Sequence, residues 1–277
     1  MAARIYLVTY TIQADWDADP IGSLEKIKEM GYEGVEFSLG VDDDTLEAIS
    51  RRLKELELEA IATHIVLDDA SANLDRYLSW MEKLGMRSLG IPWLDKRQLP
   101  GGKDYDETKR KLINLASILK EKGFDLIYHN HNLEFEKVNG VCKQDILLQD
   151  IPAMDAHLDV CWCTVGGQCP AEYIRHYGHR TKILHLKDFT ASGEFLGEKL
   201  FAMLGNDDAK EAELTRKKSG FDFRPVGYGM VDFPAVFKAA DEVGVQWMGV
   251  EQDASTERPP MEAARMSIDY IRKTYGK

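Results

Sequence analysis

The chain has 277 residues, of which 47 are acidic and 35 basic, so its net charge at pH 7 is −12. The length is close to the ~250 residues of a (β/α)₈ barrel, whereas the negative charge disfavours nucleic acid as a partner because it repels phosphate backbones. The first residues lack the basic start and apolar stretch of a signal peptide, and no apolar run approaches the ~20 residues of a membrane span, so we expect a cytoplasmic protein with no membrane partner.

Short apolar segments alternate along the chain with segments whose apolar residues have helical spacing. The predicted strands are residues 4–9, 35–38, 60–65, 88–93, 126–131, 156–160, 182–186 and 246–251. The predicted helices are residues 21–30, 43–56, 71–84, 105–122, 142–149, 170–177, 232–243 and 260–274. Strands that alternate with helices pair in parallel through crossover connections. The order therefore predicts a single (β/α)₈ TIM-barrel domain over residues 1–277.

Local signals support several of these boundaries. Gly31, Gly85 and Gly123 each follow a predicted helix, where glycine supplies a left-handed turn. Asp232 is expected to cap the next helix. Residues 188–225 form an insertion after the seventh strand that is too long for an ordinary loop and rich in glycine and charge. We expect this insertion to form a lid over the carboxyl end of the barrel.

Side chains able to bind a metal ion lie at the ends of the last four predicted strands. They are His129, Asp159, His185 and Glu251. These residues are far apart in the sequence, but a parallel barrel brings its strand ends to one rim. A carboxylate such as Asp159, within an otherwise apolar strand, needs a metal or a basic partner. The sequence therefore predicts a metal site at this rim.

Neighbouring polar residues extend the expected site. His131 lies two residues after His129, so alternation places both on the inner face of the fifth strand. Lys187 shares a face with His185 in the same way, and it is expected either to bind a polar ligand or to pair with an acid at the rim. Glu36 on the second strand is either a catalytic base or a buried acid paired with Lys187 or a histidine.

A further group of residues is expected to bind substrate, although each has a structural alternative. His64 ends the third strand and either binds hydroxyl groups or caps the rim. Trp93 and Trp162 follow strand ends, where an indole packs against a sugar ring or fills the core. Gln252 either donates to a substrate or bonds to its own loop.

Several motifs resemble the sugar phosphate isomerase/epimerase proteins of the xylose isomerase-like TIM barrels. The matching segments are YHNHNLEF at 128–135, LDVCW at 158–162, HLKD at 185–188, VGYGMVD at 226–232 and VEQD at 250–253. The resemblance implies one divalent metal ion, with ligands at Asp159, His185 and Glu251. The best-known members have Glu at the end of the fifth strand. Here either His129 replaces it or Glu134 reaches back, and we favour His129.

The resemblance also implies chemistry on a carbonyl sugar. A divalent ion, most simply Mn²⁺ with Mg²⁺, Co²⁺ or Zn²⁺ as alternatives, would stabilise the enediolate formed when the neighbouring C–H loses its proton. His131, Glu134, Lys187 and Glu36 are the expected catalytic residues. We expect a sugar isomerase or epimerase. A lyase or dehydratase acting on a keto-sugar or 3-keto-glycoside, and a non-catalytic sugar-binding barrel, are the alternatives. The sequence is compatible with a homo-oligomer. It has no glycine-rich anion cradle and no arginine cluster at the rim, so an unphosphorylated sugar is at least as well supported as a phosphorylated one.

Overall fold

The computed structural model of the chain describes residues 2–38, 43–192 and 220–276. Its centre is a closed barrel of eight parallel strands in the order β1-β12-β9-β8-β5-β4-β3-β2. The barrel strands are β1 (Arg4–Val8), β2 (Gly34–Ser38), β3 (Glu59–His64), β4 (Ser88–Ile91), β5 (Asp125–His129), β8 (Met154–Asp159), β9 (Ile183–Leu186) and β12 (Trp247–Val250). Each overlaps one predicted segment, so the predicted (β/α)₈ fold is confirmed.

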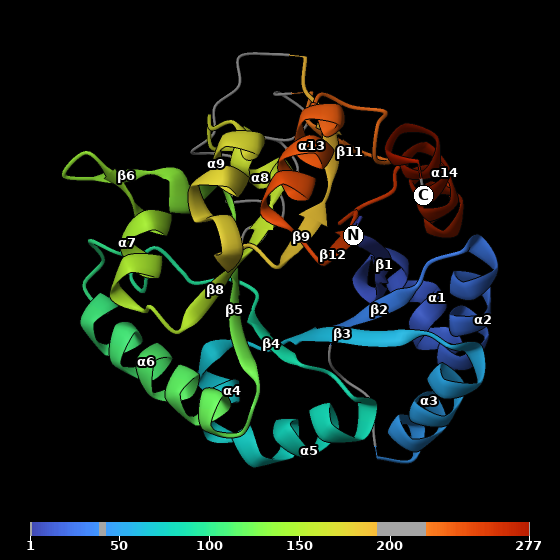
Figure 1. Cartoon of the computed structure of the whole chain (residues 1–277), viewed down its shortest axis with the longest axis horizontal. Coiled ribbons are helices and arrows are strands. Elements are labelled where there is room, and N and C mark those ends of the chain that lie inside the picture. Colours follow the sequence, from blue (N-terminus) through green and yellow to red (C-terminus); the bar gives the residue numbers. More distant parts are fainter. Residues whose placement is uncertain (1, 39–42, 193–219, 277) are drawn as a thin grey trace.

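Helices surround the strands, as Figure 1 shows. The described α-helices are α1 (Gln13–Ala18), α2 (Pro20–Met30), α3 (Asp43–Leu56), α4 (Leu67–Ala72), α5 (Leu74–Leu84), α6 (Tyr105–Glu121), α7 (Lys143–Asp150), α8 (Val160–Val165), α9 (Pro170–Tyr177), α13 (Phe233–Val243) and α14 (Pro260–Tyr275). Short 3-10 helices are η1 (Thr9–Ile12), η2 (Asn132–Phe135) and η3 (Gly178–Arg180). A bilayer span would need a longer and more apolar helix than any in the described part of the chain.

Alternate residues of each strand face opposite sides of the barrel wall. In β1, Leu7 belongs to the large hydrophobic core that includes the helices, whereas Tyr6 and Val8 belong to a smaller core with Ile127 and Ile183. Apolar side chains therefore fill the lower interior of the barrel. The polar side chains of the site come from the carboxyl-terminal halves of the strands and the residues that follow them, with Tyr6 and Glu36 at the middle of β1 and β2.

The helix ends agree with the expected local signals. The Asp19 side chain accepts a hydrogen bond from the first turn of α2, and α2 ends before Gly31, whose φ is +91°. Gly85 ends α5 in the same left-handed conformation. One prediction was wrong in detail, because the helix expected over residues 71–84 is two helices. The break lies at Asn73, whose backbone is not helical.

The insertion after the seventh barrel strand begins and ends as a two-stranded antiparallel sheet of β10 (Asp188–Thr190) and β11 (Asp222–Arg224). Residues 193–219, most of the expected lid, lie outside the described residues, so the lid remains a prediction. A second two-stranded sheet, β6 (Lys137–Val138) with β7 (Val141–Cys142), joins β5 to α7 and was not predicted from the sequence.

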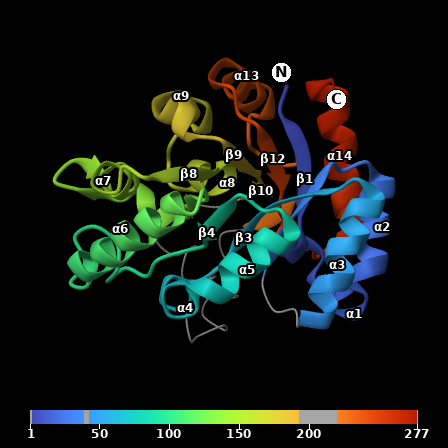
Figure 2. The ribbon, with the colours of Figure 1, turned by 60° about the horizontal axis from the view of Figure 1, so that its bottom comes forward.

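The two ends of the chain lie close together in both ribbon views (Figures 1 and 2). The backbone N–H of Ala3 donates a hydrogen bond to the Tyr275 hydroxyl at 2.9 Å, which joins the residue before β1 to the last helix. β1 pairs with both β2 and β12, so the first strand closes the barrel.

Candidate metal centre and substrate cavity

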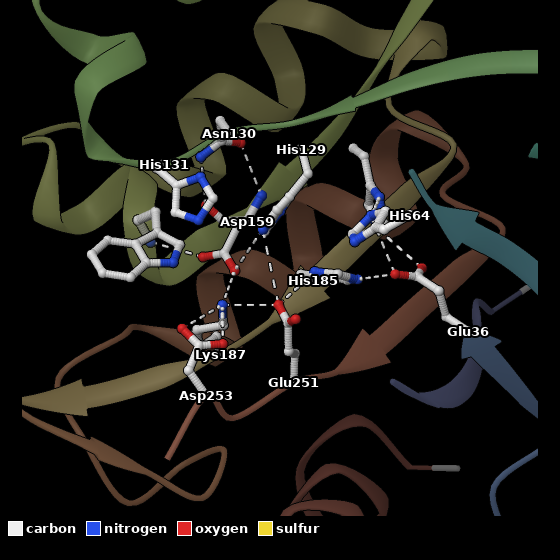
Figure 3. A network of polar contacts seen from close by, with 12 residues as sticks. Glu36, His64, His129, Asn130, His131, Asp159, His185, Lys187, Glu251 and Asp253 are labelled. Atoms are coloured by element: carbon white, nitrogen blue, oxygen red, sulfur yellow. Dashed lines mark hydrogen bonds and ion pairs between the residues drawn. The ribbon is translucent and has the colours of Figure 1, made fainter. Parts of the chain in front are cut away.

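Five of the seven histidines of the chain gather at the carboxyl end of the barrel (Figure 3). The His185 ring is central, with its centroid 4.0 Å from that of His157, 4.7 Å from that of His129 and 5.5 Å from that of His64. His131 follows β5, and its ring lies 5.0 Å from that of His129. Parallel strands that end at one rim account for this grouping of distant residues.

The four residues predicted as metal ligands lie together in one buried group, which we call the outer cluster: His129, Asp159, His185 and Glu251. Their ligand atoms are all within 4.8 Å of one another. His129 Nε2 is 3.7 Å from Asp159 Oδ2 and 3.9 Å from Glu251 Oε2. His185 Nδ1 is 2.9 Å from Glu251 Oε2. The cluster combines two imidazoles with two carboxylates, a mixture that suits divalent transition metals.

The donor atoms of the outer cluster are of the kinds that bind a metal ion. One Asp159 oxygen, Oδ1, caps α8 by accepting the Trp162 N–H at 2.8 Å, so Oδ2 is left facing the cluster. Asp159 Oδ2 and Glu251 Oε2 are buried and lie against positively charged groups, since Glu251 Oε2 is 2.9 Å from His185 Nδ1 and both oxygens lie near Lys187 Nζ. Buried carboxylates need such positive partners. A metal ion held by these atoms would supply the same kind of partner.

Lys187 lies against the same carboxylates. Its Nζ is 2.8 Å from Glu251 Oε2, 3.3 Å from Asp159 Oδ2 and 2.9 Å from Asp253 Oδ1. Burial alone would lower the pKa of Lys187, but the charges of Asp253, Glu251 and Asp159 raise it well above its usual value. Burial also raises the pKa of Asp253 to about 6, against the opposing charge of Lys187. The ion pair expected for Lys187 is therefore present, and Lys187 carries a positive charge.

A second group lies deeper in the barrel, and we call it the inner cluster: Glu36, His64, His157 and His185. His185 Nε2 is 3.0 Å from Glu36 Oε1, so His185 belongs to both clusters. Tyr6 donates to Glu36 Oε2 at 2.9 Å and lies 3.1 Å from His157 Nε2. Burial by itself raises the pKa of Glu36, but the three histidines lower it well below the usual range. Glu36 is thus a buried acid paired with histidines, one of the two roles predicted for it.

A cavity of about 290 Å³ opens beside the outer cluster. Its lining residues are Tyr10, Ser38, His64, Pro92, Trp93, His129, His131, Lys187, Glu251 and Asp253. Trp93 is 42% exposed and Tyr10 44% exposed, so both aromatic rings are accessible from solvent. The volume is near the lower end of the range of small-molecule sites. The cavity therefore has the size and the mixed polar and aromatic walls expected for one sugar ring.

His131 and Glu134 occupy different places relative to this cavity. His131 lines it, and burial together with the charge of Lys187 lowers the pKa of His131 to about 3. Glu134 is fully buried behind the rim, where it accepts hydrogen bonds from the Tyr128 hydroxyl at 2.5 Å and from the His131 backbone at 2.9 Å. Glu134 is absent from the outer cluster. This placement favours His129 over Glu134 as the fifth-strand ligand.

The remaining residues expected to bind substrate divide into two groups. His64 and Trp93 line the cavity. Trp162 is fully buried beside His131, with ring centroids 5.4 Å apart, and Lys187 Nζ lies 5.7 Å from its ring. The Gln252 amide group donates to the Ala254 carbonyl at 2.8 Å, which is its loop alternative. Neither Trp162 nor Gln252 lines the cavity.

Several residues at the site were not predicted from the sequence, among them three members of its polar network, His157, Asp253 and Tyr6. His157 lies two residues before Asp159 on β8, so alternation along that strand was an available signal. Asp253 lies two residues after Glu251 and could have been found in the same way. Tyr6 gives no signal, because an aromatic residue within an apolar strand is ordinary core composition.

Together, the fold and the site define a (β/α)₈ barrel with a buried His/carboxylate cluster that could hold a metal ion at the carboxyl ends of its strands. The chain belongs to the xylose isomerase-like TIM barrel family, whose model matches residues 24–274. The resemblance seen in the sequence motifs is thereby confirmed.

Similar proteins have more than one activity. An inosose dehydratase of Geobacillus thermodenitrificans (strain NG80-2) is 26% identical over 190 residues, which cover 67% of this chain. The chain spans about 59% of the length of that curated relative. A sugar phosphate isomerase/epimerase from Parabacteroides distasonis ATCC 8503 superposes with a TM-score of 0.75 at 20% identity, covering 98% of this chain and 94% of the other. An L-ribulose 3-epimerase superposes with a TM-score of 0.69 at 16% identity, covering 99% and 95%.

Proposed function

We propose that the protein is a divalent-metal-dependent enzyme that isomerises or epimerises a keto-sugar or sugar derivative through an enediolate. The main support is the outer cluster, whose buried ligand atoms adjoin a cavity large enough for one sugar ring. A barrel that only bound sugar would have no need for four buried ionisable side chains beside its ligand. Such groups are costly to bury unless they have a function.

The outer cluster would hold the ion through His129, Asp159, His185 and Glu251. Two imidazoles and two carboxylates suit Mn²⁺ best, with Co²⁺, Zn²⁺ and Mg²⁺ as alternatives. The ion would supply Lewis-acid stabilisation of the negative charge that develops when the C–H beside the substrate carbonyl loses its proton. Behind the site, Glu36 accepts from His185 Nε2 and so directs His185 Nδ1 toward the ion.

His131 is the side chain best placed to accept the substrate proton. The support for this role is its position, because its ring lines the cavity. The lowered pKa leaves the imidazole neutral, although it also makes the ring a weaker base than an ordinary histidine. Glu134 holds the backbone of His131 through a hydrogen bond but does not itself reach the cavity. We therefore assign Glu134 a positioning role.

Lys187 would act as the acid partner. Its raised pKa keeps it protonated, and it lines the cavity beside Glu251. A protonated ammonium can donate a hydrogen bond or a proton to a substrate oxygen. His64 and Trp93 on the cavity wall would contact hydroxyl groups and a ring face, respectively.

The charge balance of the cavity favours an unphosphorylated sugar. Lys187 is the one basic side chain among the lining residues that the structure describes, and three carboxylates already surround it. A phosphate group would need additional cations or a helix N-terminus. A neutral keto-sugar can bind in this cavity without additional cations and without a helix N-terminus.

A dehydratase or lyase is the second candidate. The inosose dehydratase relatives favour it, and so does the pairing of a neutral imidazole, His131, with a protonated amine, Lys187. Elimination needs one group that accepts the C–H proton and one that protonates the leaving oxygen. Both reactions begin with the same proton abstraction, and their products distinguish them.

Solvent deuterium exchange tests the shared first step. Protein loaded with Mn²⁺ is incubated in D₂O with a panel of ketoses, aldoses and 3-keto-glycosides, and NMR follows the C–H beside the carbonyl. We expect exchange with at least one class of sugar, and product analysis then separates epimerase from lyase. The exchange should stop with a chelator and slow by about 100-fold or more in His131→Gln.

A matched control is His179→Gln, which alters an exposed histidine outside the site and should exchange at the wild-type rate. Absence of exchange with every sugar, in protein shown to contain metal, would reject enolisation. That result would favour a non-catalytic sugar-binding barrel.

A further inference from the structure

We infer that the inner cluster is a second divalent-cation site of the zinc type, distinct from the outer cluster and formed by Glu36 Oε1, His64 Nε2, His157 Nδ1 and His185 Nε2. The four residues come from β2, β3, β8 and β9, and their ligand atoms all lie within 4.8 Å of one another. His185 would contribute Nδ1 to the outer site and Nε2 to the inner site. With both ions bound its ring would therefore be an imidazolate, having released to solvent the proton that Nε2 otherwise donates to Glu36. The inference goes beyond the proposed function, which uses only the outer cluster.

Three of the six distances between the proposed ligand atoms agree with tetrahedral coordination, and one ligand atom from each residue lies within 4.8 Å of the others. His185 Nε2 is 3.0 Å from Glu36 Oε1, His64 Nε2 is 3.3 Å from Glu36 Oε1, and His64 Nε2 is 3.3 Å from His157 Nδ1. In a tetrahedral zinc site with bonds of about 2.0–2.1 Å, neighbouring ligand atoms lie about 3.3 Å apart. The inner cluster is therefore arranged closely enough to surround one ion.

Tyr6 holds the two ligands that need an outer partner. Its hydroxyl donates to Glu36 Oε2 at 2.9 Å, and its oxygen can accept the N–H of His157 Nε2 at 3.1 Å. This pattern leaves Glu36 Oε1 and His157 Nδ1 as acceptors that face the centre of the cluster. Metal-binding histidines usually donate their second ring N–H in this way, which fixes the tautomer.

The barrel wall leaves room for these rings. A methyl group at Gly90 on β4 would lie 2.4 Å from the His64 ring, and one at Gly249 on β12 would lie 2.2 Å from the Tyr6 ring. Any larger residue would force His64 or Tyr6 to move. Glycine at positions 90 and 249 therefore leaves the space inside the barrel that the His64 and Tyr6 rings occupy.

Burial and ligand type both favour a cation here. Glu36, His157 and His185 are fully buried, so an ion held by them would be shielded from water that competes for its coordination positions. Three imidazoles and one carboxylate suit Zn²⁺, Co²⁺ or Cu²⁺ better than Mg²⁺. The outer cluster, with two carboxylates, suits Mn²⁺. We therefore expect the two sites to differ in metal preference.

Metal stoichiometry tests the inference. Bound metal is removed from untagged protein with a chelator, Zn²⁺ is added, and unbound ions are dialysed away. Elemental mass spectrometry then measures the zinc bound per chain. We expect two equivalents in the wild type and in His179→Gln, which alters an exposed histidine, and one equivalent in both His157→Gln and Asp159→Ala. His157 belongs to the inner cluster alone and Asp159 to the outer cluster alone.

Cobalt adds a signal that depends on geometry. Tetrahedral Co²⁺ absorbs visible light more strongly than six-coordinate Co²⁺. We expect a strong band in Co²⁺-loaded wild type, which persists in Asp159→Ala and disappears in His157→Gln. Should His157→Gln not fold by circular dichroism, His64→Gln at the cavity wall removes another ligand and gives the same comparison.

The outcomes separate this inference from the proposed function. One equivalent in the wild type that persists in His157→Gln and His64→Gln would overturn the inner site and leave the outer site intact. One equivalent that persists in Asp159→Ala but is lost in His157→Gln would support the inner site and remove the metal from the proposed function.

Discussion

At the scale of single residues, Glu134 differs from the other acids of the site because neither of its hydrogen-bond partners carries a charge. The Tyr128 hydroxyl donates to Oε1, and the backbone N–H of His131 donates to Oε2. Burial raises the pKa of Glu134 from 4.5 to about 7, an effect larger than the lowering by these two hydrogen bonds. Folding therefore favours the protonated form of this carboxyl group.

The raised pKa of Glu134 predicts a pH dependence of stability. An acid whose pKa rises on folding stabilises the folded chain below its unfolded pKa, and this contribution is lost as the pH rises from about 4.5 to about 7. Glutamine does not titrate. We expect the free energy of unfolding of the wild type, relative to Glu134→Gln, to fall by about 3 kcal/mol across this interval.

Urea unfolding of both proteins at the two ends of the interval measures this change. Glu82→Gln, at an exposed glutamate, should keep a constant difference from the wild type. The same constant difference for Glu134→Gln would show that folding does not raise the pKa of Glu134.

The outer cluster could be predicted from the sequence because each member lies in the last two residues of an apolar strand or directly after it. Packing alone rarely places a charged or imidazole side chain at such a position. His157 and Tyr6 were harder to predict, because they lie inside strands, where polar and aromatic residues are often ordinary parts of the core. Only the three-dimensional contacts show that they join Glu36.

At the scale of elements, Asp188 connects the insertion to the barrel. It is fully buried in β10 and accepts four backbone hydrogen bonds, from Phe189, Gly227, Gly229 and Val231, at 2.7–3.1 Å. Three of these donors lie in the loop before α13. One carboxylate therefore fixes the start of β10 against that loop.

Asp188→Ala should strongly destabilise this region, because four backbone N–H groups, two of them in fully buried hydrogen bonds, lose their acceptor at once. We expect a loss of about 3 kcal/mol or more in the free energy of unfolding, measured in urea. Asp232→Ala is the matched comparison, since Asp232 is exposed and accepts a single N–H, from Ala235, at the start of α13. That change should cost about 1 kcal/mol. Equal losses would contradict the assigned role of Asp188.

The same scale shows which elements the sequence could predict. All eight barrel strands were predicted because short apolar runs bounded by glycine or charge are typical of buried strands. α8 (Val160–Val165) was missed, because it starts directly after Asp159 and its apolar residues resemble a continuation of β8.

At the scale of the whole molecule, the two clusters connect strands that are far apart in the sequence. The outer cluster involves β5, β8, β9 and β12, and the inner cluster involves β2, β3, β8 and β9. Barrel closure, which no local pattern in the sequence specifies, brings these strands together. A cation bound at the outer cluster would therefore stabilise the barrel itself and not only the local loops.

Metal binding should raise the stability of the whole barrel. Because the ligands lie together only in the folded chain, a free Mn²⁺ concentration 100-fold above the dissociation constant adds about 2.7 kcal/mol to the free energy of unfolding. In a domain of this size that gain corresponds to a rise of about 5–10 °C in the melting temperature. Thermal unfolding across a series of Mn²⁺ concentrations measures it, with chelator-treated protein as the reference. The gain should shrink in Asp159→Ala and persist in His179→Gln, and an equal gain in all three proteins would place the stabilising Mn²⁺ outside the outer cluster.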